Sequence, residues 1–281
     1  MTAKVLLFGY TGKVGTALTT ALSDDYTLIG VNSKDIDVRD LEAVDRLLKK
    51  HQPDIVINTV AMLGLDACEA EPSRATAINT LFPQRLAHHS ADIGYRLIHF
   101  STESIFSGKE TGFFAEDDDA YPLNQYGFTK YASELAVRLH APDSLIFRLP
   151  VLFGPSPKRN QLLEKMIDRV RDGANELRIA NDIVTTPTYS VDIAETVVKA
   201  LKEGLAPGLY HIANSEKATL HQLVSEAVSL LGLHATVHQA SHTDFPSPVD
   251  KALYTPLIQS KLPPLRPWRE ALAAYCRDFG C

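Results

Sequence analysis

Two side chains in the middle of the chain have the types and spacing needed for proton transfer. The stretch Leu123–Glu134 reads LNQYGFTKYASE and places Tyr126 and Lys130 four residues apart. If the segment is helical, both side chains leave the same face of the helix as neighbours. A nearby ammonium favours phenolate, so the spacing predicts a tyrosine with a lowered pKa and a transferable proton. The same spacing also arises by chance on exposed helices, so it needs support from elsewhere in the sequence.

A hydroxyl group from an earlier segment is expected to join this pair. The apolar run at 96–100 reads as a buried strand, and Ser101 and Thr102 follow it at its carboxyl end. Parallel α/β sheets bind their ligands outside the carboxyl ends of the strands. Thr102 is therefore a candidate to hydrogen-bond a substrate carbonyl beside Tyr126, although a threonine after a strand is more often part of a turn.

A glycine-rich turn near the start of the chain predicts a dinucleotide site. The apolar run Val5–Phe8 is typical of a buried parallel strand, and Gly9, Gly12 and Gly15 follow it as G-x-x-G-x-x-G. Apolar residues at helical spacing come next. Glycines let a pyrophosphate approach the backbone, where the free N–H groups of the helix favour an anion. A plain tight turn is the alternative, but the strand before it and the helix after it favour dinucleotide binding.

The end of the second expected strand, roughly Tyr26–Val31, bears on the choice between NADP(H) and NAD(H). An NAD-preferring site usually has an acidic residue there, which accepts a hydrogen bond from the 2′-hydroxyl of the ribose. Here the chain continues with Asn32, Ser33 and Lys34, which can hydrogen-bond and neutralise a 2′-phosphate. We therefore expect NADP(H) to be preferred, with NAD(H) as the second choice. The alternative, that Lys34 is an exposed loop lysine without contact to the cofactor, is nearly as well supported by the sequence.

Alternating strand and helix patterns predict an α/β fold of the Rossmann type, with a doubly wound parallel sheet. The alternation loosens after Pro155, which indicates a smaller, discontinuous C-terminal substrate lobe. We expect a dinucleotide-binding domain at 1–154, to which roughly 176–203 return, and a lobe that takes up most of 155–281. The last helix, Trp268–Phe279, could dock on its own domain or on a second subunit, so a homodimer is one expected assembly.

The composition favours a small-molecule substrate. The 281 residues are 45% hydrophobic and 22% charged, with a net charge of −6, which argues against a nucleic acid or an anionic membrane as partner. No stretch approaches the ~20 apolar residues of a membrane span. Three widely spaced cysteines without a C-x-x-C motif favour a reducing, cytoplasmic location. The histidines and the acidic run at 116–119 lack ligand spacing, so we expect no catalytic metal.

The sequence resembles the extended short-chain dehydrogenases/reductases and, within them, the dTDP-4-dehydrorhamnose reductase family. The matching segments are spread over most of the chain: GYTGKVG, DIDVRD, PDIVINTVA, LDACEAEPSRATAIN, STESIF, PLNQYGFTKYASE, LIFRLPVLFG, TTPTYSVDIAE and GLYHIA. The resemblance implies an oxidoreductase that transfers hydride from NAD(P)H to the keto group of a nucleotide-linked deoxysugar. It implies Thr102, Tyr126 and Lys130 as the catalytic set. Tyr126 would protonate the carbonyl oxygen, while Lys130 would lower the pKa of Tyr126 and hold the nicotinamide ribose.

The resemblance also implies which residues hold the cofactor. Besides Tyr126 and Lys130, the pyrophosphate would lie against Gly9, Thr11, Gly12, Lys13, Val14 and Gly15. Asp37 and Val38 would lie by the adenine, and Ala61 and Met62 would lie along the cofactor.

The sequence departs from the family where the sugar would bind. Glu103 and Ser104 replace the usual Asp-Tyr, and Pro150 and Val151 replace a Ser-Trp pair. Cys68 stands in place of a lysine, and the Arg-Pro element near the C-terminus is not recognisable. We expect Glu103, Ser104, Pro150 and Val151 to lie on the substrate side of the site. The cofactor and proton-transfer residues match the family, so the reaction type is expected to be retained, whereas the sequence does not identify rhamnose as the sugar.

A regulatory protein of the same fold gives the alternative function. The segments RLPVLFG and TPTYSVDIAE also resemble the regulatory β subunit of methionine adenosyltransferase. In that role the protein would bind NADP and a partner enzyme without turning over a substrate.

Overall fold

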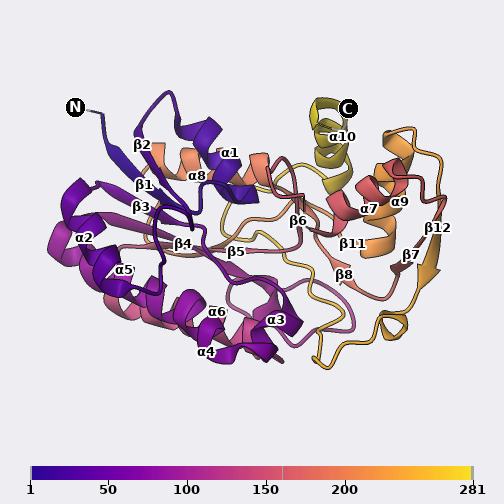
Figure 1. The fold of residues 1–281 in the computed structure, drawn as a ribbon, viewed down its shortest axis with the longest axis horizontal. Coiled ribbons are helices and arrows are strands. Elements are labelled where there is room, and N and C mark those ends of the chain that lie inside the picture. Colours follow the sequence, from indigo (N-terminus) through magenta and orange to yellow (C-terminus); the bar gives the residue numbers. More distant parts are fainter. Residues whose placement is uncertain (1, 160, 280–281) are drawn as a thin grey trace.

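The structure, a computed structural model, describes residues 2–159 and 161–279, and its centre is a six-stranded parallel sheet (Figure 1). The strand order is β10-β5-β4-β3-β1-β2. These strands are β1 (Lys4–Phe8), β2 (Thr27–Val31), β3 (Ile55–Asn58), β4 (Arg96–Thr102), β5 (Leu145–Leu149) and β10 (Gly208–His211). The order reverses between β1 and β3, which is the point where ligands bind in sheets of this kind. The predicted α/β fold with a Rossmann-type parallel sheet is confirmed.

Helices cover both faces of the sheet (Figure 1). One face carries α1 (Lys13–Leu22) and α8 (Ser190–Lys202), and the other carries α2 (Leu41–His51), α5 (Phe82–Ile93) and α6 (Gln125–His140). Successive side chains of a strand point to opposite faces, so the strands supply two separate cores. Leu7 and Phe147 pack with α1 and α8, whereas Leu6 and Ile146 pack with α2, α5 and α6.

Two late segments complete the main sheet. Strand β10 extends it beyond β5, and α8 packs beside α1. The sequence predicted a return over 176–203, but the structure pairs β7 (Glu176–Ala180) with β12 (Thr236–Ala240), outside the main sheet. The reason is that Leu177 and Ile179 of β7 are buried in the second lobe. The return therefore runs from α8 to β10, and the division near residue 154 stays a prediction.

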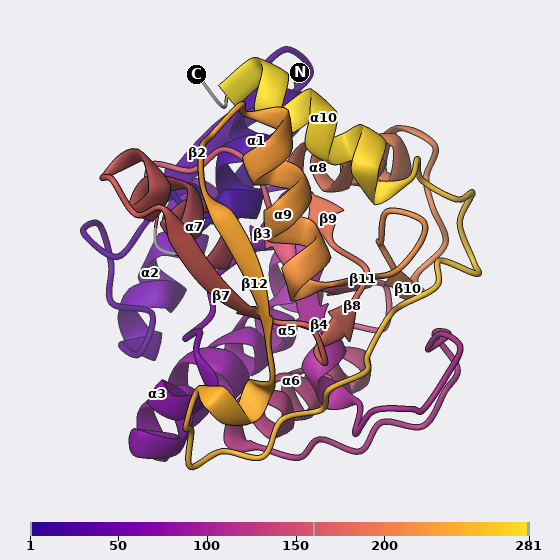
Figure 2. The same cartoon turned by 90° about the vertical axis from the view of Figure 1, so that its right-hand side faces the viewer.

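The second lobe is built from helices around the β7–β12 pair (Figure 2). Helices α7 (Leu162–Arg171), α9 (Leu220–Leu230) and α10 (Trp268–Phe279) share one hydrophobic cluster with β7. The predicted last helix is confirmed, and Trp268 and Tyr275 bury it against its own chain. In the part of the chain described, no helix combines the length and the apolar character that crossing a membrane requires.

Short elements connect these parts. They are α3 (Leu65–Ala70), α4 (Pro72–Thr76), the π-helical turn η1 (Ala77–Leu81), the 3-10 turns η2 (Glu103–Ile105) and η3 (His242–Asp244), and the short strands β6 (Leu152–Phe153), β8 (Val184–Thr185), β9 (Thr188–Tyr189) and β11 (Ala218–Thr219). Residues 72–93 thus form α4, η1 and α5 in succession.

Candidate active site

The three side chains predicted to be catalytic come from β4 and the first turns of α6. Thr102 is the last residue of β4, and Tyr126 and Lys130 lie near the start of α6. The helix begins there because the Asn124 side chain accepts a hydrogen bond from the Gly127 N–H at 2.9 Å. The side chain of Thr102 hydrogen-bonds the phenol of Tyr126. The structure therefore brings the hydroxyl and the phenol together at the carboxyl end of β4.

The pKa of Tyr126 differs from the expectation drawn from the sequence. Burial raises the pKa of Tyr126 to about 12, although the hydrogen bond with Thr102 acts to lower it. The Lys130 ammonium, which was predicted to lower it, instead donates to the Phe100 carbonyl at 2.6 Å. Burial lowers the pKa of Lys130 to about 8, although the nearby charge of Glu134 acts to raise it. The prediction of a lowered tyrosine pKa is wrong for this structure, because removing water from the phenol outweighs a charge one helical turn away.

A buried hydrogen-bond chain holds this part of α6 against the sheet. Asn58 lies 3.3 Å from His99 Nδ1, and His99 Nε2 lies 2.9 Å from Ser133 Oγ. Ser133 donates its proton to the Lys130 carbonyl at 2.6 Å, so His99 carries its hydrogen on Nε2 and accepts from Asn58 on Nδ1. Burial holds the pKa of His99 well below its ordinary value, so the imidazole stays neutral. Sequence reasoning placed His99 in a strand and missed this role.

The glycine turn has the geometry of a phosphate cradle. Gly9 has a φ of +84°, and a Cβ on Gly15 would lie 2.2 Å from the Gly9 carbonyl oxygen, so the tight turn requires glycine. Gly12 begins α1 without a side-chain cap, which leaves the first N–H groups of the helix available to an anion. Thr59, just after β3, donates to the Gly9 carbonyl at 3.1 Å. These features fit the pyrophosphate of a dinucleotide.

Two residues of this turn direct their side chains away from the expected pyrophosphate. Lys13 is buried, and its ammonium pairs with Glu164 of α7 at 2.5 Å and donates to the Gly154 carbonyl at 3.1 Å. Val14 packs in the core with α8. Lys13 and Val14 are therefore available to a pyrophosphate only through their backbone N–H groups. Thr11 is half-buried in the turn.

The residues expected near the adenosine lie in one loop after β2. The Asn32 side chain accepts from the Lys34 N–H at 2.7 Å, and Asp35 accepts from the Asn32 N–H at 2.9 Å. Hydrogen bonds from Arg39 lower the pKa of Asp37 to about 2. Sequence reasoning missed both the Asp35 contact and Arg39, a second cation of the loop. The other predicted loop residues are the exposed Ser33 and the half-buried Val38.

A single buried amide holds the loop after β3 beside α6. Asn79, in the π-helical turn η1, accepts from the Met62 N–H at 2.8 Å and donates to the Met62 carbonyl at 3.2 Å. It also donates to Thr129 Oγ of α6 at 3.2 Å. Ala61 and Met62, expected along the cofactor, are half-buried in this loop. Sequence reasoning missed Asn79, although π-helical turns are frequent at functional sites.

The residues expected on the substrate side have different environments. The carboxyl group of Glu103 is buried and accepts from Thr185 Oγ at 2.6 Å, with further hydrogen bonds from Thr255 and the Val151 N–H. Burial raises the pKa of Glu103 to about 8 against these hydrogen bonds. Its carboxyl group thus joins the turn η2, which follows β4, to β8. Of the other three, Ser104 and Val151 are half-buried and Pro150 is buried.

We expect Glu103→Gln to stabilise the protein increasingly as pH rises. The pKa of Glu103 is about 8, above the ordinary 4.5, so the wild type loses stability between these pH values as the buried carboxyl group resists the ionisation that the unfolded chain undergoes. A neutral amide avoids this loss. The variant should melt close to the wild type at pH 5 and roughly 2–4 °C higher at pH 9, or about 1 kcal/mol. Calorimetry across this range, with the exposed Glu110→Gln as control, measures the effect, and a pH-independent difference would contradict it.

Other candidate side chains have structural partners. Arg148 pairs with Glu134 through two nitrogens at 3.0 and 2.8 Å, so it has a structural partner. Two further arginines that could meet a diphosphate also pair with acids: Arg159 with Asp168, and Arg178 with Asp244. Burial raises the pKa of the Cys68 thiol to about 11, which agrees with a packing role.

The sheet and its site define a class of protein. A Rossmann-type sheet, a glycine turn beside its switch point and a Thr-Tyr-Lys set at the end of β4 are the features of an extended short-chain dehydrogenase/reductase. The protein is thus an NAD(P)-dependent oxidoreductase.

The chain belongs to the RmlD substrate-binding domain family, whose model matches residues 3–281. It is 30% identical over 280 residues to the spore coat polysaccharide biosynthesis protein SpsK of Bacillus subtilis, covering 98% of this chain and 97% of that protein. It is also 30% identical over 280 residues to dTDP-4-dehydrorhamnose reductase of Mycolicibacterium smegmatis, covering 97% and 84%. The crystal structure of dTDP-4-dehydrorhamnose reductase from Bacillus anthracis, in complex with NADP, matches with a TM-score of 0.93 and 23% identity over 99% of this chain and 100% of that one. The resemblance seen in the sequence is confirmed.

Proposed function

We propose that the protein uses NADPH to reduce the keto group of a nucleotide-linked deoxysugar, with dTDP-4-dehydrorhamnose as the first substrate to test. The observation that carries the proposal is that Thr102, Tyr126 and Lys130 lie together where β4 ends and α6 begins, with Lys130 donating to the Phe100 carbonyl of β4 and Thr102 beside the phenol of Tyr126. The names of the relatives and the glycine turn support the same reaction.

In this proposal Thr102, Tyr126 and Lys130 have distinct tasks. Bound at the glycine turn, the reduced cofactor would supply hydride. Tyr126 keeps its proton across the neutral range, because burial raises its pKa to about 12, so it can donate that proton to the substrate's carbonyl oxygen. Thr102 holds the phenol in place through their hydrogen bond. Lys130, whose pKa is lowered to about 8 by burial, is still mostly charged at pH 7 and donates to the Phe100 carbonyl, and in this proposal its task is to hold the nicotinamide ribose.

The experiment that tests the function is a turnover assay. Purified protein is mixed with NADPH and dTDP-4-dehydrorhamnose, and NADPH oxidation is followed together with formation of the reduced sugar. Related 4-keto sugar nucleotides are then compared, since Glu103 and Val151 replace the residues usual on the sugar side. Tight NADPH binding without turnover of any of these compounds would favour the alternative, a regulatory NADP-binding subunit.

We propose that NADPH is preferred over NADH. Lys34 is exposed in the loop after β2, and Arg39 adds a second cation there. If Lys34 neutralises the 2′-phosphate, Lys34→Ala should lower kcat/KM for NADPH roughly tenfold, or about 1.4 kcal/mol, and leave NADH unchanged. Lys50→Ala, which removes an exposed lysine of α2, is the matched control. An unchanged NADPH/NADH ratio in Lys34→Ala would count against this assignment.

Two further expectations complete the proposal. A homodimer stays a prediction, which light scattering coupled to size-exclusion chromatography checks. A cytoplasmic location stays a prediction from the cysteine usage, and fractionation of the source cells checks it.

A further inference from the structure

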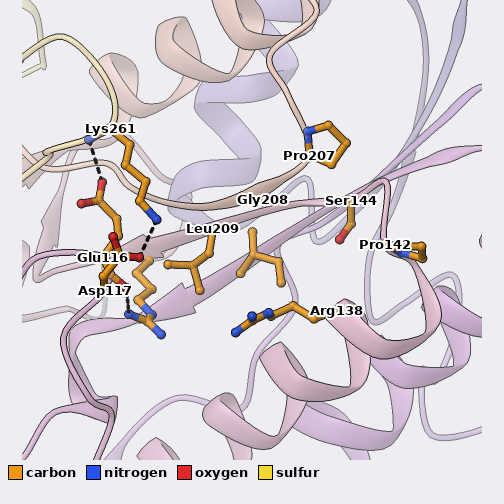
Figure 3. A pocket seen from close by; sticks show the side chains of 11 residues that line it. Glu116, Asp117, Arg138, Pro142, Ser144, Pro207, Gly208, Leu209 and Lys261 are labelled. Carbon is orange, nitrogen blue, oxygen red and sulfur yellow. Dashed lines mark hydrogen bonds and ion pairs between the residues drawn. The ribbon is translucent and has the colours of Figure 1, made fainter.

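A second pocket lies at the edge of the main sheet, between β5, β10 and the end of α6 (Figure 3). Its cavity has a volume of about 270 Å³. Ser144 and Ile146 enter it from the α6 face of the sheet, because Leu145 and Phe147 point into the opposite core with α1 and α8. Thr102, Tyr126 and Lys130 do not line this pocket, so it is distinct from the candidate active site.

Three cations line the pocket, and one of them lacks a counterion. Arg148 is held by Glu134, and Lys261 pairs with Asp117 at 2.7 Å. Arg138, in the last turn of α6, is exposed and has no ion pair with any residue that the structure describes. Figure 3 shows the Arg138 side chain reaching from the helix into the pocket. Its guanidinium is therefore free to bind an anion.

Both acidic side chains of the pocket wall are already engaged, Asp117 by Lys261 and Glu116 by other donors. The Glu116 carboxylate accepts from the backbone N–H groups of His211, Ser260 and Lys261. The Ser260 hydroxyl donates to it as well. Glu116 keeps its negative charge, because these hydrogen bonds lower its pKa, but its oxygens are occupied by donors other than Arg138.

A hydroxyl without a protein partner faces the same pocket. Ser144 is 4% exposed, and its side chain makes no hydrogen bond to any residue that the structure describes. The hydroxyl is not among the fully buried atoms that lack a partner, so it stays accessible from the pocket and can hydrogen-bond a group that enters there. In Figure 3 the Ser144 oxygen is directed into the pocket that Arg138 enters. The remaining wall is largely apolar, with Pro142, Ile146, Pro207 and Leu209.

We propose that this pocket binds a small organic anion, a carboxylate or phosphate group on a short apolar body. Arg138 supplies the charge and Ser144 a hydrogen bond to the anionic group, while Ile146 and Leu209 contact the apolar body. A cavity of about 270 Å³ lies below the usual range of drug-sized sites, so it suits a small metabolite rather than a nucleotide sugar.

Calorimetric titration of the full chain tests the proposal. The probes are acetate, isobutyrate, pyruvate and phosphoenolpyruvate, each compared with sodium chloride at equal ionic strength. We expect at least one probe to bind saturably with a Kd of ~1 mM or below. Arg138→Gln should weaken that binding at least about tenfold, and Ser144→Ala should weaken it too. Arg46→Gln, which changes another exposed helical arginine, should leave it unchanged.

The outcomes are distinct from those of the reductase assay. Arg138→Gln should retain wild-type turnover and melting temperature, because Arg138 is exposed and outside the catalytic set. Preference for pyruvate over phosphoenolpyruvate would identify a carboxylate site, and the reverse a phosphate site. Absence of saturable binding by all four probes, or equal affinity in wild type and Arg138→Gln, would overturn the proposal.

Discussion

Replacing Tyr126 with phenylalanine is expected to lower kcat for the 4-keto sugar nucleotide by ~10²–10⁴-fold, because the variant has no proton to donate to the carbonyl oxygen. The effect should fall on kcat more than on KM, since the ring that shapes the site is retained. The substitution also removes the hydrogen bond between the phenol and Thr102. Steady-state kinetics at saturating NADPH measure the effect.

Tyr131→Phe is the matched control for this experiment. Tyr131 is a half-buried tyrosine of the same helix, and it packs against a different cluster, which contains Ile105 and Phe114. This substitution should change kcat less than about twofold, well below the ~10²-fold that removal of a general acid produces. Equal effects of the two substitutions, or a Tyr126→Phe variant with near wild-type kcat, would remove Tyr126 as the proton donor.

Replacing Lys13 with methionine should destabilise the protein by about 3–5 kcal/mol, because the buried Glu164 carboxylate loses its counterion. One oxygen of Glu164 already lacks a hydrogen-bond partner among the described residues, so without Lys13 neither oxygen keeps its present ion-pair partner. Burial also lowers the pKa of Lys13, while its attraction to Glu164 opposes the shift. Thermal unfolding should show a melting temperature lower by on the order of 10 °C.

The double variant Lys13→Met/Glu164→Leu separates the charge from the packing. Removing both charges avoids an unpaired buried ion, so most of the stability should return. Lys202→Met breaks the half-exposed pair with Asp25 and should cost less than about 1 kcal/mol. The double variant should also retain NADPH affinity, because the Lys13 ammonium contacts Glu164 and Gly154 rather than the expected phosphate. If Lys13→Met were no less stable than Lys202→Met, the buried Lys13–Glu164 pair would not have the stabilising role assigned to it.

The features that the sequence predicted correctly depend on local patterns. The turn from Gly9 to Gly15 is recognisable because a strand, three glycines and a helix follow one another within a short stretch. Tyr126 and Lys130 share one helix, and Trp268–Phe279 is an amphipathic helix whose bounds agree with the structure. Thr102 reaches the pair because β4 and α6 are consecutive major elements of a parallel sheet.

The features that sequence reasoning missed depend on distant partners or on burial. Glu164 follows Lys13 by 151 residues, so no local pattern connects them. Thr185 and Thr255, two of the donors to Glu103, come from late segments that only the folded chain brings to the turn after β4. The direction of the Tyr126 pKa depends on how much water the fold removes from the phenol, and spacing along a helix does not contain that quantity.

The position of α8 and β10 late in the chain has a consequence for synthesis on the ribosome. Until residue 211 has emerged, β5 is an open edge of the sheet, and Phe147 lacks the cover of Ile193 and Val197. A nascent chain that ends near residue 154 therefore presents apolar surface and an unpaired strand, the two features that promote aggregation and attract chaperones. The order in which the ribosome releases the segments thus makes completion of the nucleotide-binding unit a late event in the synthesis of each molecule.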